Sequence, residues 1–335
     1  MRRGLGPILL LGAVLMVLLA APLDAYLKLG VLVGNDLVGI QWTNQPVRYF
    51  VTNRDVPNVT APQLQAALAR AFAEWGRPAD IRLQSEFAGF VGADPVEGDA
   101  MSVIGFQSRP EMERTLGATS FTFDDITGEI IESDIFLNSA FDWSSAANGE
   151  TGRFDVESIL VHEVGHLLGL GHSALGETQA AAGGGRLVLG KRAVMFPIAY
   201  SRGSIEDRTL EADDVSGITD IYSTASAQQR LGAIAGKVTL NGAGVFGAHV
   251  TAFNPATGEL VSGFSLTPQG NFVIAALKPG HYIVRVEPLD DADLDSFFDE
   301  DSGVNIDFQV TYFSRQVAVP AGGISSQIEI KVRRK

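Results

Sequence analysis

Between residues 47 and 168, apolar positions follow two spacings, one helical and one extended. The helical spacing after Thr60 comprises Leu64, Leu68, Ala71, Phe72 and Trp75. Thr60 and Gln63 form a capping-box pattern with Pro62 in the first turn, which predicts that a core-packing helix begins there. Extended segments separated by Gly-rich and acidic turns predict strands at 47–51, 81–86, 102–106, 119–123 and 130–137.

A second helical pattern begins near Asp155, a residue that favours the N-cap position. Its wide apolar face comprises Val156, Ile159, Leu160, Val164, Leu167 and Leu168. His162 and His166 are four residues apart, so they lie on one side of this helix, one turn apart. Two imidazoles so placed can share one Zn²⁺, and Glu163 beside the first can act as general base for a water that the metal activates.

The residues after this helix complete the motif His-Glu-x-x-His-x-x-Gly-x-x-His. Gly169 has no Cβ, so the chain can leave the helix through a left-handed turn that brings His172 back as a third ligand. Three protein ligands leave one position open, as a catalytic zinc requires. The alternative is a helix with ordinary surface histidines, but the fixed spacing argues against it. The other two of the five histidines, His249 and His281, have the pattern of strand residues.

The pattern changes after residue 222. Residues 225–232 are polar and weakly patterned, and we expect a linker with few buried contacts. Because the histidine motif ends well before the linker, we expect the chemistry to be complete without the C-terminal domain. That domain, 233–335, is predicted to be an all-β sandwich from evenly spaced strands expected at 234–240, 248–254, 260–265, 271–275 and 281–286.

The extended histidine motif resembles the zinc site of the metzincin metallopeptidases, and Ser173 after the third histidine resembles the matrixin branch. The resemblance spans about residues 40–224 and implies an α+β fold for residues 26–224, with a twisted mixed sheet and three main helices. It also implies a zinc-dependent endopeptidase. Three further segments resemble matrixins: 128–143, 193–197 and 210–222.

The same resemblance assigns roles to single residues. His162, His166 and His172 would bind one catalytic Zn²⁺. Glu163 would take a proton from the attacking water and deliver it to the leaving amine. Met195 would be the hydrophobic floor beneath the metal, a Met-turn residue with no chemistry of its own.

A protein or peptide substrate would lie extended along an edge strand that includes Gly117 and Ala118. Pro197 and Tyr200 would form a wall of its side-chain pocket, although Tyr200 stands one residue further on than in the family pattern. Between the third histidine and the Met-turn the chain has an insertion. It includes the small residues 180–185, which we expect to form a flexible loop beside the cleft.

Two departures from the family change the expected chemistry. The chain has no Cys, so it has neither disulfides nor the cysteine-based latency of animal matrixins. Ala118 and Phe136 stand where matrixins hold a second, structural zinc with histidines, so we expect the catalytic zinc alone.

Residues 233–289 resemble carboxypeptidase regulatory-like domains, with the segment Leu-Lys-Pro-Gly-His-Tyr at 277–282 as one matching feature. Such modules carry no catalytic residues, and we expect this one to contact a cell surface or matrix. Acidic residues at 290–295 and 299–301 could bind Ca²⁺. The spacing of an ion-binding loop with its central Gly is absent, so a solvated acidic loop is the preferred interpretation.

The N-terminus and the charge complete the prediction. Residues 1–25 contain Arg2 and Arg3 before an apolar run and resemble a secretory signal, with an uncleaved anchor as the alternative. A net charge of −14 disfavours nucleic acid as a partner. The sequence thus predicts a secreted, monomeric zinc endopeptidase. The rival class is a non-catalytic surface adhesin that binds through its β-sandwich, and the motif alone leaves hydrolysis of a non-peptide amide open.

Overall fold

The computed structural model describes residues 28–33, 36–182, 185–298 and 302–335. The expected signal segment at 1–25 and the acidic residues 299–301 lie outside these ranges. Of the helices in the described part, none has the length and apolar character needed to cross a membrane.

The described ranges contain few helices and many strands, as the sequence predicted. The helices are α1 (Ala61–Trp75), α2 (Val156–Leu167), α3 (Ala212–Tyr222) and α4 (Ala225–Arg230), with 3₁₀ turns η1 (Glu206–Arg208) and η2 (Leu294–Ser296). Three strand pairs stand alone: β1 (Gly30–Val33) with β2 (Asp36–Gly39), β8 (Trp143–Ser144) with β9 (Phe154–Asp155), and β10 (Gly176–Ala180) with β11 (Arg186–Lys191).

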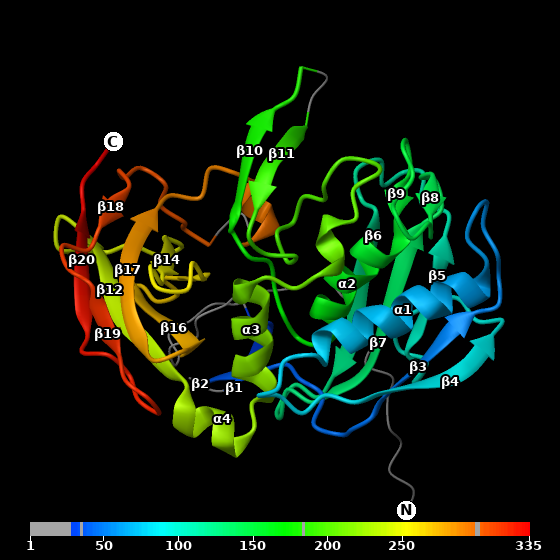
Figure 1. The fold of residues 1–335 in the computed structure, drawn as a ribbon, viewed down its shortest axis with the longest axis horizontal. Coiled ribbons are helices and arrows are strands. Elements are labelled where there is room, and N and C mark those ends of the chain that lie inside the picture. The colour runs from blue at the N-terminus through cyan, green and yellow to red at the C-terminus, as the bar shows by residue number, and fades with distance from the viewer. Residues whose placement is uncertain (1–27, 34–35, 183–184, 299–301) are drawn as a thin grey trace, which may run out of the picture.

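The N-terminal half is built on one five-stranded mixed sheet in the order β4-β3-β5-β7-β6 (Figure 1). Its strands are β3 (Val47–Thr52), β4 (Ser85–Val91), β5 (Val103–Gln107), β6 (Gly117–Phe123) and β7 (Ile130–Asn138). All neighbours are parallel except the edge strand β6, which runs antiparallel to β7. Helices α1 and α2 pack on one face of this sheet, and the indole of Trp75 donates to the Val161 carbonyl at 2.7 Å.

Most of the expected N-terminal elements are confirmed within about two residues, a margin typical of helix and strand ends. Thr60 and Gln63 form the capping box at the start of α1. The strand expected at 81–86 is the exception, because β4 begins only at Ser85 and Ile81 makes an isolated bridge to Ser223. An apolar residue beside a chain crossing has the same local pattern as a strand residue, and only the tertiary contact separates them.

The C-terminal half contains two sheets that contribute to one apolar core. The first comprises β12 (Gly232–Leu240), β13 (Ala243–Gly244), β16 (Asn271–Leu277) and β20 (Ile328–Val332). The second comprises β14 (His249–Phe253), β15 (Leu260–Phe264), β17 (Gly280–Glu287), β18 (Thr311–Tyr312) and β19 (Val317–Val319). The five strands expected here are all present, each within about two residues of its predicted bounds.

The segment between the two halves contains a short helix that the sequence did not predict. Residues 225–232 include helix α4, which is capped by Thr224 and buries Ala227 completely. Helix α3 packs against β15 and β16, and its Ser216 hydroxyl donates to the Ala275 carbonyl at 2.8 Å. Of residues 225–232 only Ala227 and Gly232 are buried, which agrees with the expectation of few buried contacts. Their role as a linker stays a prediction.

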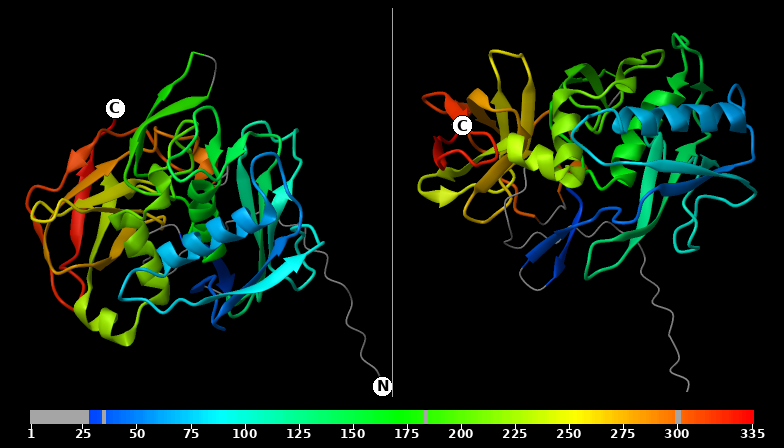
Figure 2. Two further views of the ribbon diagram at one scale, coloured as in Figure 1. Left: turned by 45° about the vertical axis from the view of Figure 1, so that its right-hand side comes forward. Right: turned by 60° about the horizontal axis from the view of Figure 1, so that its bottom comes forward.

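The insertion before the Met-turn contains two strands that the sequence did not predict. Strands β10 and β11 pair in antiparallel register and form a hairpin that projects from the body of the molecule (Figures 1 and 2). Residues 183 and 184 at its tip lie outside the described ranges. The expected loop at 180–185 thus begins on the last residue of β10, and its flexibility stays a prediction.

Candidate metal centre

Helix α2 fixes the first two histidines of the motif. Asp155 caps the helix by accepting from the Ser158 amide at 2.8 Å, as the sequence predicted. Arg208 donates to the same carboxylate through two nitrogens, at 2.6 and 2.8 Å. The cap and the buried apolar face hold the helix in one orientation, which keeps His162 and His166 directed to the same point.

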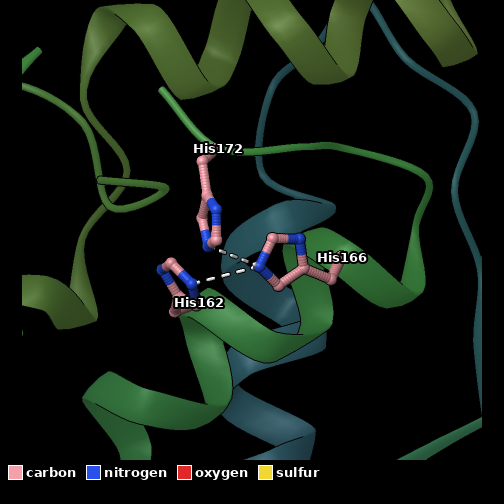
Figure 3. A group of neighbouring side chains, drawn as sticks. All are labelled: His162, His166 and His172. Carbon is pink, nitrogen blue, oxygen red and sulfur yellow. Dashed lines mark hydrogen bonds between the residues drawn. The ribbon is translucent and has the colours of Figure 1, made fainter. Parts of the chain in front are cut away.

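Gly169 turns the chain back after the helix. Its φ is +96°, and a Cβ at this position would stand 2.2 Å from the Ile40 carbonyl oxygen. Both the backbone angle and the close approach therefore require Gly. The turn returns His172 to the helix, as expected from the spacing (Figure 3).

The three imidazoles converge through their Nε2 atoms. His166 Nε2 lies 3.2 Å from Nε2 of both His162 and His172. Each Nδ1 faces a backbone carbonyl: that of Val194 at 2.8 Å for His162, Leu170 at 2.8 Å for His166 and Ser296 at 2.6 Å for His172. A carbonyl only accepts, so each Nδ1 carries the proton and each Nε2 presents a lone pair.

This arrangement fits a zinc ion. Three lone pairs that face one another at such distances repel unless a cation lies between them. Nitrogens bound to one tetrahedral Zn²⁺ lie about 3.3 Å apart, because Zn–N bonds are about 2.0–2.1 Å long. Burial lowers the pKa of all three imidazoles, that of His166 to about 3, so the rings stay neutral and able to ligate.

Glu163 lies beside the histidines and is 5% exposed. Its carboxylate accepts from the Thr119 hydroxyl at 2.8 Å, a contact that connects α2 to the edge strand β6. Burial raises the pKa of Glu163 to about 7, and the Thr119 hydrogen bond opposes this rise. A carboxyl group with that pKa can both accept and release a proton near neutral pH. Thr119 was not predicted as a site residue.

Met195 is fully buried beneath the site. A Cβ at Gly165 in α2 would stand 2.3 Å from its sulfur, so the helix and the Met-turn are in close contact. The Asp214 carboxylate accepts from the amides of Val194 and Met195 at 2.8 and 3.1 Å. The Met-turn thus supports the metal ligands indirectly, since the Val194 carbonyl holds His162.

A cleft of about 750 Å³ contains the histidines and Glu163. Of the residues predicted to bind substrate, Gly117, Ala118 and Pro197 line this cleft. Tyr200 lines a neighbouring cavity of about 290 Å³, where its hydroxyl accepts from the Lys191 amide at 3.2 Å.

Ala118 and Phe136, the positions discussed for a structural zinc, are cross-strand partners of β6 and β7. Among the described residues, the three histidines are the one group of His, Cys, Asp or Glu side chains spaced to hold a metal. A single zinc per chain stays a prediction.

A segment of the C-terminal half also contacts this site. Besides the Ser296 carbonyl, the ring of Phe297 lies edge-on to the His172 imidazole, with centroids 6.4 Å apart. Ser296 and Phe297 also line the cleft. All three candidate ligands and Glu163 nevertheless precede residue 225, so completeness of the chemistry without the C-terminal domain stays a prediction. A contact between residues 124 positions apart leaves no trace in local sequence patterns.

Comparison with known proteins agrees with this geometry. A family model described as matrixin matches residues 41–181. Metalloendoproteinase 1 of Glycine max is 29% identical over 177 residues, covering 47% of this chain and 45% of that protein. Metalloendoproteinase 5-MMP of Arabidopsis thaliana is 30% identical, with 52% and 45% covered. Matrilysin of Homo sapiens is 24% identical, with 57% and 61% covered.

The chain spans about half the length of the curated plant relatives that it matches. The matched residues contain all three histidines of the site and Glu163. The residues that match the matrixin family model thus contain the candidate metal centre.

Proposed function

We propose that the chain is a zinc-dependent endopeptidase. The observation that carries this proposal is the convergence of three neutral imidazoles on one point, each oriented by a backbone carbonyl, with a buried carboxyl group beside them. The matrixin match supports the choice of peptide bonds as the substrate class.

His162, His166 and His172 would hold the ion. When bound, Zn²⁺ supplies Lewis-acid chemistry: it makes water a nucleophile near neutral pH and polarises a carbonyl oxygen. Glu163 takes the proton of the water that attacks the peptide carbonyl, and then gives it to the leaving amine. Thr119 keeps the Glu163 carboxylate turned toward the cleft during both transfers.

The substrate backbone is proposed to lie along β6, the terminal strand of its sheet. Gly117 and Ala118 on this strand line the cleft and offer backbone groups to an extended peptide. Pro197 also lines the cleft, and we keep Tyr200 as a wall residue of the adjoining cavity.

Metal analysis combined with peptide cleavage tests the proposal. We expect one zinc per chain, loss of cleavage with a chelator and recovery on addition of Zn²⁺. A protein that binds zinc but cleaves neither casein nor a diverse peptide library would favour the adhesin or the non-peptide amidase.

The C-terminal residues 233–335 are proposed to form a carboxypeptidase regulatory-like β-sandwich, supported by the core that its two sheets share. We propose secretion because residues 1–25 resemble a signal segment. We also propose that the protein is a monomer and binds no nucleic acid, because its net charge is −14. For residues 290–295 a solvated acidic loop stays the preferred proposal and Ca²⁺ binding the alternative.

A further inference from the structure

The third histidine depends on a distant part of the chain for its orientation. His162 and His166 face carbonyls of the Met-turn and of the loop that follows α2. His172 Nδ1 instead faces the carbonyl of Ser296, in the C-terminal half, at 2.6 Å. This is the shortest of the three contacts.

A single 3₁₀ turn presents that carbonyl. The amides of Phe297 and Phe298 both donate to the Leu294 carbonyl at 2.9 Å, which closes the turn η2. The two Phe rings are each 3% exposed and pack on Phe264, with ring centroids 5.9 and 5.5 Å apart. The turn is therefore anchored to the C-terminal sheets, and it is held rigidly where it meets the imidazole.

The hairpin before the Met-turn holds the same segment from the other side. Thr178 on β10 donates through its amide to the Asp291 carboxylate at 2.9 Å and through its hydroxyl to the Asp291 carbonyl at 2.6 Å. Arg186 on β11 donates to the Asp290 carbonyl at 3.0 Å. Residues 290–298 are thus fixed between the hairpin and the C-terminal sheets.

We propose that Ser296 is a positioning residue of the zinc centre, and that the C-terminal domain thereby sets the zinc affinity of the site. Its carbonyl fixes the tautomer of His172 and the direction of its Nε2 lone pair, and it increases the basicity of the ligand. Loss of such an outer hydrogen bond typically weakens metal binding about 10- to 100-fold. The inference rests on the proposed zinc function.

A backbone change in the full chain tests the carbonyl directly. Phenyllactic acid in place of Phe297 turns the 296–297 amide into an ester, which makes the Ser296 carbonyl a weaker acceptor and keeps every side chain. The same acid in place of Phe298 is the matched control. Each ester removes one amide that donates to Leu294, but only the first alters the acceptor of His172.

Zinc dissociation constants from competition with a chelator are the readout. We expect the ester at 297 to weaken zinc binding about 10-fold, and the control to stay within about twofold of wild type. Equal constants for the two esters, with wild type binding zinc, would overturn this inference and leave the proposed function intact. A wild-type chain that does not bind zinc would overturn both.

A pair of ordinary variants supports the test. Phe297→Leu removes the ring against His172, whereas Phe308→Leu removes a fully buried ring of the C-terminal core away from the site. We expect Phe297→Leu, but not Phe308→Leu, to weaken zinc binding and to change the visible spectrum of the Co²⁺-loaded chain. Equal zinc constants and spectra for the two variants would contradict the proposal.

Discussion

At the residue scale, a backbone carbonyl orients each candidate zinc ligand through its Nδ1. The Nε2 of each ring faces the position where the three imidazoles converge, so one hydrogen bond fixes both the orientation and the tautomer of the ring. Glu163 is held in the same manner by Thr119. Side chains restrained in this way meet the narrow geometric tolerance of catalysis.

Glu163→Gln tests the assigned base. Gln has nearly the same shape but cannot take a proton, so we expect zinc to remain bound while turnover falls at least ~10²-fold. Metal analysis and a peptide assay on the same sample separate the two effects. Cleavage near the wild-type rate with zinc bound would show that another group takes the proton.

Gly165→Ala tests the contact between α2 and the Met-turn. The added Cβ would stand 2.3 Å from the Met195 sulfur and 2.7 Å from the Trp75 ring, so the helix must shift. We expect a loss of about 1–3 kcal/mol in unfolding free energy, as for other overpacked cores. Gly190→Ala is the control, because no atom lies within 4 Å of its added Cβ. Equal denaturant midpoints for the two variants would contradict this packing.

The sequence predicted the residues whose partners are near in the chain and missed those whose partners are distant. Spacing alone brings His162, His166 and His172 together, because a helix and one Gly turn determine their geometry. Thr119 and Ser296 reach the site through tertiary packing, from 44 and 124 residues away. No local motif marks either residue.

At the element scale, α1 and α2 could be predicted because a capping residue and a broad apolar face coincide in each. The hairpin of β10 and β11 was missed because its strands expose many of their residues and lack a strong alternation. Helix α3 was expected only through family resemblance, yet it connects the two halves. Its Asp213 is fully buried, contacts the Ser173 hydroxyl and accepts from the Ser262 amide at 2.6 Å.

Asp213 predicts a pH dependence of stability. Burial raises its folded-state pKa from 3.8 to about 8, so the folded chain retains a proton that the unfolded chain releases within that range. The stability that this group contributes is fully present below pH 3.8 and is lost as the pH rises through about 8. Asp213→Asn has no such titration and keeps the size of the side chain.

Urea unfolding of wild type and Asp213→Asn checks this expectation. Between about pH 5 and about pH 8, wild type should lose up to about 1.4 kcal/mol per pH unit relative to the variant. Titration of the histidines is common to both proteins and cancels in the difference. Parallel stability curves would show that the Asp213 carboxyl is ionised throughout this range.

At the scale of the whole molecule, the two halves share an apolar cluster beside the cleft. Ala174 and Phe196 contribute from the N-terminal half, and Phe264, Leu289, Ala292, Phe297 and Phe298 from the C-terminal half. The buried Asp213 of α3 also accepts from the Ser262 amide of the C-terminal half, and helix α4 joins the two halves along the chain. The sequence showed that the helix-containing pattern ends near residue 222 and that a strand pattern follows. It could not show that the N-terminal and C-terminal halves share an apolar cluster.

Truncation after Ala227 tests whether the halves fold together. Removal of the C-terminal half would expose Phe196, whose burial alone is worth about 1.5–3 kcal/mol, and would leave Asp213 and His172 without their partners. We expect the full chain to unfold in one thermal transition, and the truncated chain to aggregate or to melt at a lower temperature with weaker zinc binding. Calorimetry, light scattering and zinc titration measure these three properties. A soluble truncated chain with a cooperative melt and the zinc affinity of the full protein would establish two independent domains, and the shared core would then have no part in building the metal centre.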